Sequence, residues 1–355
     1  MDLARYQRQT LFQEIGQDGQ ERLLAATAVI VGCGATGSAL ANLLVRAGVG
    51  RVRIIDRDFI ELNNLQRQIL FDEDDIAANL PKAEAAGRKL RRVNSGIAVE
   101  AVVADVNAGN VLDLIGDATV VLDGTDNFTT RFLINDACIR LALPWVYCGV
   151  LASYGMTATF VPAGAAEKLP GERAVTGCLR CLMGDAPAPG VTATCDTVGV
   201  IGPVVTLLSS IAAVEAMKLI VGRGTLNPGL LHFDLWLHEY EQFGGGGPRP
   251  GCPACDLHRL EFLEAEAGAT SAALCGRNAV QVSVTAPGGR APRLDLARLE
   301  RQLAPVASRL ARNEYLLRAQ IDGYEFTVFP DNRAIIKGTE DENLAKGLFA
   351  KYIGG

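Results

Sequence analysis

The stretch VIVGCGATGS, from Val29 to Ser38, constrains the fold of this chain more than any other segment. It joins an apolar run to three glycines in a G-x-G-x-x-G arrangement, Gly32, Gly34 and Gly37. Glycines at this spacing allow a tight turn from a strand into a helix, whose N-terminus attracts phosphate. The stretch therefore predicts a nucleotide-binding α/β fold. The identity of the nucleotide stays open, because the backbone N–H groups contact only phosphates.

Apolar runs and amphipathic runs alternate between residues 28 and 150. Strands that alternate with crossover helices form a mostly parallel sheet. The predicted fold class is therefore α/β, with a doubly wound, Rossmann-like sheet. We expect strands at 28–32, 51–56, 98–106, 118–127 and 145–150, and helices at 38–47, 81–94 and 129–141.

A longer apolar stretch runs from Val198 to Gly222. The charged residues Glu215 and Lys218 interrupt it, whereas a membrane span needs about 20 predominantly apolar residues. We therefore expect a buried core helix here and no association with a membrane.

The end of the chain has a different pattern. A strand near 279–284, a helix at 294–307, several short strands and a final helix at 341–353 indicate a small α+β module. We therefore divide the chain into a main domain, residues 1–258, and an accessory module, residues 259–355.

Composition argues against several classes of protein. The net charge of −6 and the sequence pI of about 5.3 are not those of a dedicated nucleic-acid surface. The first residues lack the apolar core of a secretory signal, so we expect a cytoplasmic protein. Nine cysteines, an odd number, then favour reduced thiols over a disulfide framework.

Polar residues that follow the second expected strand indicate phosphate chemistry. Asp56 ends this strand, where a carboxylate can bind ribose hydroxyls. Asn64 and Arg67 follow in a loop, and Lys82 begins the next helix. Two cations near a phosphate chain suit transfer at phosphorus, because its transition state gathers negative charge on non-bridging oxygens. A nicotinamide enzyme has no such need.

Several segments in a fixed order extend this interpretation. They are RYQRQ, GCGATGS, DRDFIELNNLQRQ, PKAEAA, LDGTDNFTTRFLIND and GVIGPVVTLLSSIAAVEAMKLI. Together they resemble the MoeB/ThiF/HesA family, bacterial relatives of the ubiquitin-activating enzymes, over residues 3–256. The resemblance implies that the glycine loop binds ATP and that residues 1–258 form an ATP-binding adenylation domain.

The same resemblance implies the roles of individual residues. Gly32, Gly34 and Gly37 would line the phosphate loop, Asp56 would bind the ribose, and Asn64, Arg67 and Lys82 would contact the triphosphate. Arg67 and Lys82 would offset charge at the α-phosphorus.

The GTDN segment supplies the remaining site residues. Asp126 would hold Mg²⁺, a hard cation suited to carboxylate and phosphate oxygens. Asn127 and Arg131 are interpreted as structural supports of this loop, with an ion pair on the face of the helix as the alternative for Arg131. Arg8 matches an arginine that the family presents to the ATP of a dimer partner, so we expect a homodimer.

The implied reaction is adenylation of the C-terminal Gly-Gly carboxylate of a small ubiquitin-like sulfur-carrier protein, in thiamin, molybdopterin or related sulfur metabolism. The final module shows no cysteine-centred active loop of a rhodanese, so the sulfur would come from another protein such as a cysteine desulfurase. Two alternatives remain open: a tRNA-modifying dehydratase of the same superfamily and a non-catalytic scaffold of the same fold.

Two C-x-x-C segments indicate a metal site. They place Cys178 with Cys181 and Cys252 with Cys255, and two such pairs are typical of a closed, structural four-thiolate zinc site. Cys195 follows at a position where the family often has a cysteine on the loop that crosses the active site. A covalent role for this thiol in sulfur transfer and a role outside catalysis are both open.

Overall fold

Strand β1 (Thr27–Val31) lies inside an eight-stranded sheet in the order β3-β2-β1-β4-β5-β6-β7-β8. Its alternate side chains are buried on opposite faces, with Ile30 in one apolar cluster and Val29 in another. Burial on both faces is typical of a parallel strand covered by helices. The computed structural model describes residues 3–187, 195–264, 270–274, 278–283 and 294–354.

The sheet has a parallel part and an antiparallel part. Strands β3, β2, β1, β4 and β5 pair in parallel, and β6, β7 and β8 extend the sheet in antiparallel fashion. The predicted α/β, Rossmann-like, mostly parallel sheet is thus confirmed. The remaining strands are β2 (Arg51–Ile55), β3 (Ala98–Val102), β4 (Val120–Asp123), β5 (Trp145–Leu151), β6 (Tyr154–Phe160), β7 (Leu230–Asp234) and β8 (Glu239–Phe243).

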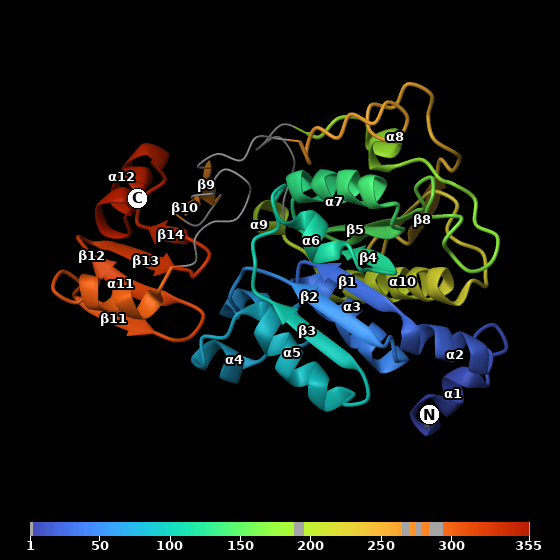
Figure 1. The fold of residues 1–355 in the computed structure, drawn as a ribbon, viewed down its shortest axis with the longest axis horizontal. Helices are drawn as coiled ribbons and strands as arrows, with labels where there is room; N and C mark the ends of the chain where they lie inside the picture. The colour runs from blue at the N-terminus through green and yellow to red at the C-terminus, as the bar shows by residue number, and fades with distance from the viewer. Residues whose placement is uncertain (1–2, 188–194, 265–269, 275–277, 284–293, 355) are drawn as a thin grey trace. The chain divides into compact units, whose positions relative to one another are not determined.

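Helices cover both faces of this sheet (Figure 1). One apolar layer includes α3 (Ala35–Ala47), α5 (Lys82–Val93) and α10 (Gly202–Val221), and the opposite layer includes α6 (Val111–Ile115) and α7 (Phe128–Leu141). The chain reverses its strand order between β1 and β4, and ligands of such sheets bind at the carboxyl ends of the strands near this point. The shorter helical elements of this part are η1 (Ala4–Tyr6), α1 (Gln7–Thr10), α2 (Gly16–Ala25), η2 (Leu62–Asn64), α4 (Glu73–Ala77), α8 (Leu179–Met183) and α9 (Cys195–Val198).

Helix α10 is, within the described residues, the one helix long and apolar enough to cross a membrane. It packs against α3, β5 and β6. Its buried Glu215 accepts hydrogen bonds from Thr159 of β6 (2.7 Å) and from Lys218 (2.7 Å). These contacts place α10 in the apolar core that covers one face of the sheet, as we expected from the sequence.

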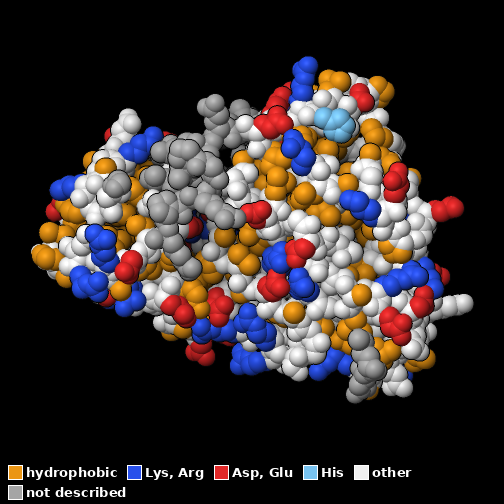
Figure 2. Space-filling view, viewed as in Figure 1, with side chains coloured by type: hydrophobic (Ala, Val, Ile, Leu, Met, Phe, Trp, Pro, Cys, Tyr) orange, Lys and Arg blue, Asp and Glu red, His pale blue; other side chains and the backbone are white. Residues whose placement is uncertain are grey.

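The chain divides into two compact units, residues 1–264 and residues 265–355. The first unit therefore ends at Glu264 and not at residue 258. Phe262 explains the difference, because its ring lies 5.1 Å from that of Phe132 and its backbone N–H donates to Asp136 (3.0 Å). On the face shown in Figure 2, cationic and anionic side chains are interspersed with hydrophobic ones.

The second unit contains a six-stranded antiparallel sheet in the order β11-β12-β13-β14-β10-β9. Helices α11 (Leu296–Leu303) and α12 (Glu342–Tyr352) share one apolar cluster with this sheet. This is the α+β module that the sequence predicts. Its strands are β9 (Thr270–Leu274), β10 (Ala279–Ser283), β11 (Arg309–Arg312), β12 (Leu317–Ile321), β13 (Tyr324–Val328) and β14 (Arg333–Lys337).

Candidate active site

Gly32 and Gly37 are packed closely against main-chain atoms where β1 leads into α3. Gly32 has a φ of +92°, and a Cβ there would lie 2.5 Å from the carbonyl oxygen of Gly124. A Cβ on Gly37 would lie 1.9 Å from the carbonyl oxygen of Gly32. These positions admit only glycine, because a methyl group would collide with main-chain atoms that cannot move aside. The loop is thereby pressed against the end of β4.

Gly34 differs from its neighbours. A Cβ there would approach no protein atom closer than 3.9 Å, the distance to Nε2 of Gln68. Gly34 is also the N-cap of α3, and no side chain caps this helix. Uncapped N–H groups and the helix dipole attract an anion, so the start of α3 is a candidate site for a phosphate group.

Asp56, directly after β2, is held next to this loop. Its carboxylate accepts a hydrogen bond from the backbone N–H of Cys33 (2.6 Å) and another from that of Asp58 (2.6 Å). Burial raises the pKa of Asp56, although the cation of Lys82 opposes this shift. Asp56 thus lies against the glycine loop, and its ribose-binding role stays a prediction.

Lys82 begins α5 as a buried cation. Its Nζ lies 3.4 Å from a carboxylate oxygen of Asp58. Burial lowers the pKa of Lys82, but attraction to Asp58, Asp56 and Asp126 outweighs burial and raises the pKa above its ordinary value. Lys82 therefore keeps its positive charge. The carboxylates of Asp56, Asp58 and Asp126 all act on its ammonium group.

The segment between β2 and α4 carries Asn64 and Arg67. Asn64 is buried and its Oδ1 accepts the backbone N–H of Glu61 (3.2 Å), so this side chain shapes the turn that holds Arg67. Arg67 donates to the carbonyl oxygen of Asn63 (2.8 Å). The contacts of both residues with a triphosphate stay predictions.

Asp126 lies in the loop between β4 and α7. Its side chain is exposed, and its charge acts on both Lys82 and Arg131. Asn127 caps α7 by accepting the backbone N–H of Thr130 (2.9 Å). The guanidinium of Arg131 is buried and donates to Asp123 (3.0 Å) and to the carbonyl oxygen of Thr125 (2.7 Å). The predicted role of Asn127 and Arg131 as supports of this loop is confirmed. Arg131 does form an ion pair, but with the buried Asp123 of β4 and not along the face of its own helix.

Arg8 is not brought to these residues within the same chain. Gln9, next to it on α1, donates to the carbonyl oxygen of Ala47 (2.9 Å), the last residue of α3. The two ends of this 13-residue helix lie about 18 Å apart, at about 1.5 Å per residue. Arg8 is thus exposed near the end of α3 that is remote from the phosphate loop. Its predicted role toward a partner's ATP stays a prediction.

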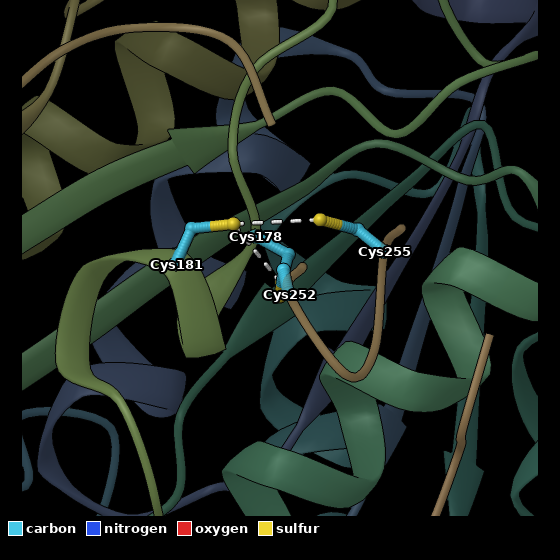
Figure 3. A group of neighbouring side chains, drawn as sticks. All are labelled: Cys178, Cys181, Cys252 and Cys255. Carbon is cyan, nitrogen blue, oxygen red and sulfur yellow. Dashed lines mark hydrogen bonds between the residues drawn. The ribbon is translucent and has the colours of Figure 1, made fainter. Parts of the chain in front are cut away.

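The four cysteines of the two C-x-x-C segments converge (Figure 3). Their sulfur atoms lie within 4.8 Å of one another, with 3.7 Å between Cys178 and Cys252 and 3.4 Å between Cys181 and Cys255. A tetrahedral zinc ion with bonds of about 2.3 Å has sulfur–sulfur edges of about 3.8 Å. Burial raises the pKa of the Cys178 thiol to about 12 and so disfavours an unpaired thiolate there, whereas a bound cation would stabilise thiolates at this distance. The cluster fits zinc.

The side chain of Cys195 lies outside the described residues, although α9 begins at this position. Its proposed part in sulfur transfer therefore stays a prediction.

Two residues of the site were missed from the sequence. Asp58 pairs with Lys82, and Asp123 pairs with Arg131. Both lie within segments that carry the family resemblance, so their presence was visible there. Their pairings were not, because Asp58 lies 24 residues before Lys82, and Asp123 ends a strand whereas Arg131 lies on the helix that follows.

Residues 6–254 match the sequence profile of the ThiF family. The chain belongs to the ThiF family. This confirms the predicted family, and the fold and family are those of adenylyltransferases of the ThiF and MoeB type.

This ThiF-family protein is similar to proteins that have been named and to one that has been solved. It is 42% identical over 354 residues to the sulfur carrier protein ThiS adenylyltransferase of Bacillus subtilis, covering 99% of each chain. It is 37% identical over 263 residues to the SAMP-activating enzyme E1 of Haloferax volcanii, covering 74% of this chain and 92% of that protein. Its fold matches that of E. coli MccB with ATP, at a TM-score of 0.59 and 25% identity, covering 71% of this chain and 74% of MccB.

Proposed function

We propose that this ThiF-family protein catalyses the ATP-dependent adenylation of the C-terminal Gly-Gly carboxylate of a ubiquitin-like sulfur-carrier protein. The observation that carries the proposal is the buried, charged Lys82 near the uncapped N-terminus of α3 at Gly34. This arrangement suits a phosphate chain. A dinucleotide oxidoreductase needs the glycine loop but no buried lysine opposite it.

In the proposed reaction, a carboxylate oxygen of the carrier attacks the α-phosphorus in line. The bond from the α-phosphorus to the bridging oxygen breaks, and pyrophosphate leaves. The attacking carboxylate is already ionised near pH 7, so the protein supplies no general base. The N–H groups at the start of α3 hold phosphate oxygens, Asp56 binds the ribose, and Arg67 and Lys82 offset the charge that develops at the α-phosphorus.

Two metals complete the proposal. Asp126 would hold Mg²⁺, which neutralises charge on the leaving pyrophosphate when it is bound. The residue fits this ion, because it offers one exposed carboxylate and proteins commonly bind Mg²⁺ through one or two carboxylates together with phosphates. Zinc would occupy the four-cysteine cluster, where its closed coordination gives it a structural role.

The proposed partner is a carrier of the ThiS kind, since the relative with 42% identity over almost the whole chain is named for that substrate. The hairpin of β7 and β8 offers a surface for a protein partner. The edge strand β8 is exposed along its length, and Trp236, Leu237 and Tyr240 are 76%, 62% and 63% exposed. Exposed apolar side chains beside an open sheet edge are typical of a protein-binding surface.

Three further parts of the proposal rest on the family resemblance. The enzyme acts as a homodimer in which Arg8 of each chain serves the other chain's ATP. The sulfur comes from a separate donor such as a cysteine desulfurase. The reaction takes place in the cytoplasm.

ATP–pyrophosphate exchange tests the proposed reaction. The purified protein is assayed with Mg²⁺ in the presence and absence of each small protein of its genome that ends in Gly-Gly. We expect exchange that depends on one such protein and is lost in Arg67→Ala. Arg92→Ala is the matched control, because Arg92 is exposed near the opposite end of α5 from Lys82. Exchange with none of the candidates, despite ATP binding, would favour a nucleoside substrate or a scaffold.

A further inference from the structure

The loop that carries Asp126 is held by a closed network of buried groups. Asp123, at the end of β4, is fully buried, and one of its oxygens accepts both the backbone N–H (2.8 Å) and the hydroxyl (2.6 Å) of Thr125. Its other oxygen accepts Nε of Arg131 (3.0 Å). Arg131 in turn donates to the carbonyl oxygen of Thr125 (2.7 Å). Thr125, the residue before Asp126, is therefore held at both its backbone N–H and its carbonyl group.

The same network is anchored to two other parts of the sheet. Arg131 also donates to the carbonyl oxygen of Cys148 on β5 (3.0 Å), which sets the loop against the neighbouring strand. Gly124 joins the loop to the phosphate loop, because a Cβ there would lie 2.5 Å from the carbonyl oxygen of Gly32. Asp126 thus extends from a backbone whose position is determined relative to the glycine loop.

The Asp126 carboxylate itself has little direct support. Its one hydrogen bond among the described residues comes from the neighbouring Asn127 at 3.4 Å, and its side chain is exposed. The position of its oxygens is therefore set by the main chain of residues 124–126 and by the groups that hold this main chain.

We propose that Asp123 and Arg131 are positioning residues for the Mg²⁺ ligand Asp126. They hold Asp126 at a distance from the glycine loop that lets its carboxylate and bound ATP share one Mg²⁺ ion. The inference rests on the proposed function, because it takes Asp126 as the ligand. Buried partners that orient a metal ligand commonly change metal affinity about 10- to 100-fold when they are replaced.

Arg131→Lys tests this role. Lysine keeps the positive charge beside Asp123, but its single ammonium cannot reproduce the planar set of donors that contacts Asp123, Thr125 and Cys148 together. ATP binding to the full-length protein is measured by calorimetry in EDTA and across a Mg²⁺ titration. We expect the Mg²⁺ concentration for half-maximal tightening to rise at least about 10-fold, with binding in EDTA within about threefold of the wild type.

Two further variants separate positioning from stability. Thr125→Val removes the hydroxyl hydrogen bond to Asp123 and keeps the backbone one. It should therefore raise the Mg²⁺ requirement by a smaller factor than Arg131→Lys. If Arg131→Lys does not fold, Thr125→Val tests the inference in its place. Glu215→Gln is the matched control, because Glu215 is a buried acid of the same unit with three hydrogen bonds remote from the loop. It should lower the unfolding temperature and leave the Mg²⁺ requirement unchanged.

An unchanged Mg²⁺ requirement in both Arg131→Lys and Thr125→Val, with a lowered unfolding temperature, would show a merely structural role and overturn the inference. Because the assay needs no carrier protein, it is independent of whether the carrier reaction is correct. A wild-type protein that binds no nucleotide would instead overturn the proposed function, and the inference with it.

Discussion

Oδ1 of Asn135 accepts a hydrogen bond of 2.9 Å from the backbone N–H of Leu179. Leu179 lies between the first two cysteines of the four-cysteine cluster, and Asn135 lies on α7, whose N-terminus follows the Asp126 loop. One helix therefore contacts both candidate metal sites. The four-cysteine cluster and the Asp126 loop are therefore both supported by α7.

Replacement of a cluster cysteine should remove the metal. We expect Cys252→Ser to lose a bound zinc ion and to lower the free energy of unfolding, because three thiolates leave the coordination incomplete. Metal content by mass spectrometry and unfolding by urea measure the two effects. Cys138→Ser is the control, since Cys138 is equally buried but belongs to another apolar cluster, and it should retain zinc. Equal zinc content in both variants would contradict the assignment.

The buried carboxyl of Asp136 predicts a pH dependence of stability. Burial raises its pKa from an ordinary 3.8 to about 6. A folded pKa above the unfolded one means that the folded state holds the proton more tightly. The wild type therefore loses stability from this group as the pH rises from about 4 to about 6, by at most about 3 kcal/mol.

Asp136→Asn should lack this loss. Its free energy of unfolding relative to the wild type is expected to rise between pH 4 and pH 7. Urea unfolding followed by tryptophan fluorescence measures it, and both tryptophans, Trp145 and Trp236, lie in the first unit. Any loss of zinc at low pH affects both proteins, so it cancels in the difference. A difference that does not change with pH would show that Asp136 does not titrate in this range.

Two glycines of one motif should respond differently to alanine. In Gly37→Ala the methyl group meets a carbonyl oxygen at 1.9 Å, so we expect a loss of more than about 4 kcal/mol in unfolding free energy, or no folded protein. In Gly34→Ala the methyl group lies at ordinary contact distance, 3.9 Å from Nε2 of Gln68, so stability should fall far less. The methyl group would instead occupy the space for phosphate and weaken ATP binding at least about 10-fold, which is about 1.4 kcal/mol. Unaltered ATP binding in Gly34→Ala would place the nucleotide elsewhere.

The proposed sharing of Arg8 between chains predicts complementation. Arg8→Ala and Lys82→Met should each be inactive alone in the exchange assay. When the two are unfolded together and refolded, mixed dimers contain one site with both Lys82 and the partner chain's Arg8. Random mixing of a symmetric dimer then restores roughly a quarter of the wild-type sites. Activity that never rises above that of the separate variants would argue against a shared site.

Much of the fold was predictable from the sequence, because its signals are local. Alternating apolar strands and amphipathic helices indicate a parallel sheet wherever they occur, and the glycines of the phosphate loop follow from turn geometry. Local signals were less accurate at boundaries. Helix α3 begins at Ala35 and not at Ser38, since the turn at Gly34 leads directly into the helix. Strands β6, β9 and β11 were not expected individually, because strand pairing depends on distant partners.

The sequence by itself determined the candidate site residues: the glycines, Asp56, Lys82, Asp126 and the two C-x-x-C segments. Only the tertiary structure decided their neighbours. It placed Asp58 beside Lys82 and Asp123 beside Arg131, joined Asn135 to the cysteine cluster, and put Arg8 near the end of α3 remote from the phosphate loop. The reason is physical. A side chain's own type and its near neighbours fix what it can donate, accept or coordinate, whereas its partners lie on other strands and helices that meet only when the sheet is assembled.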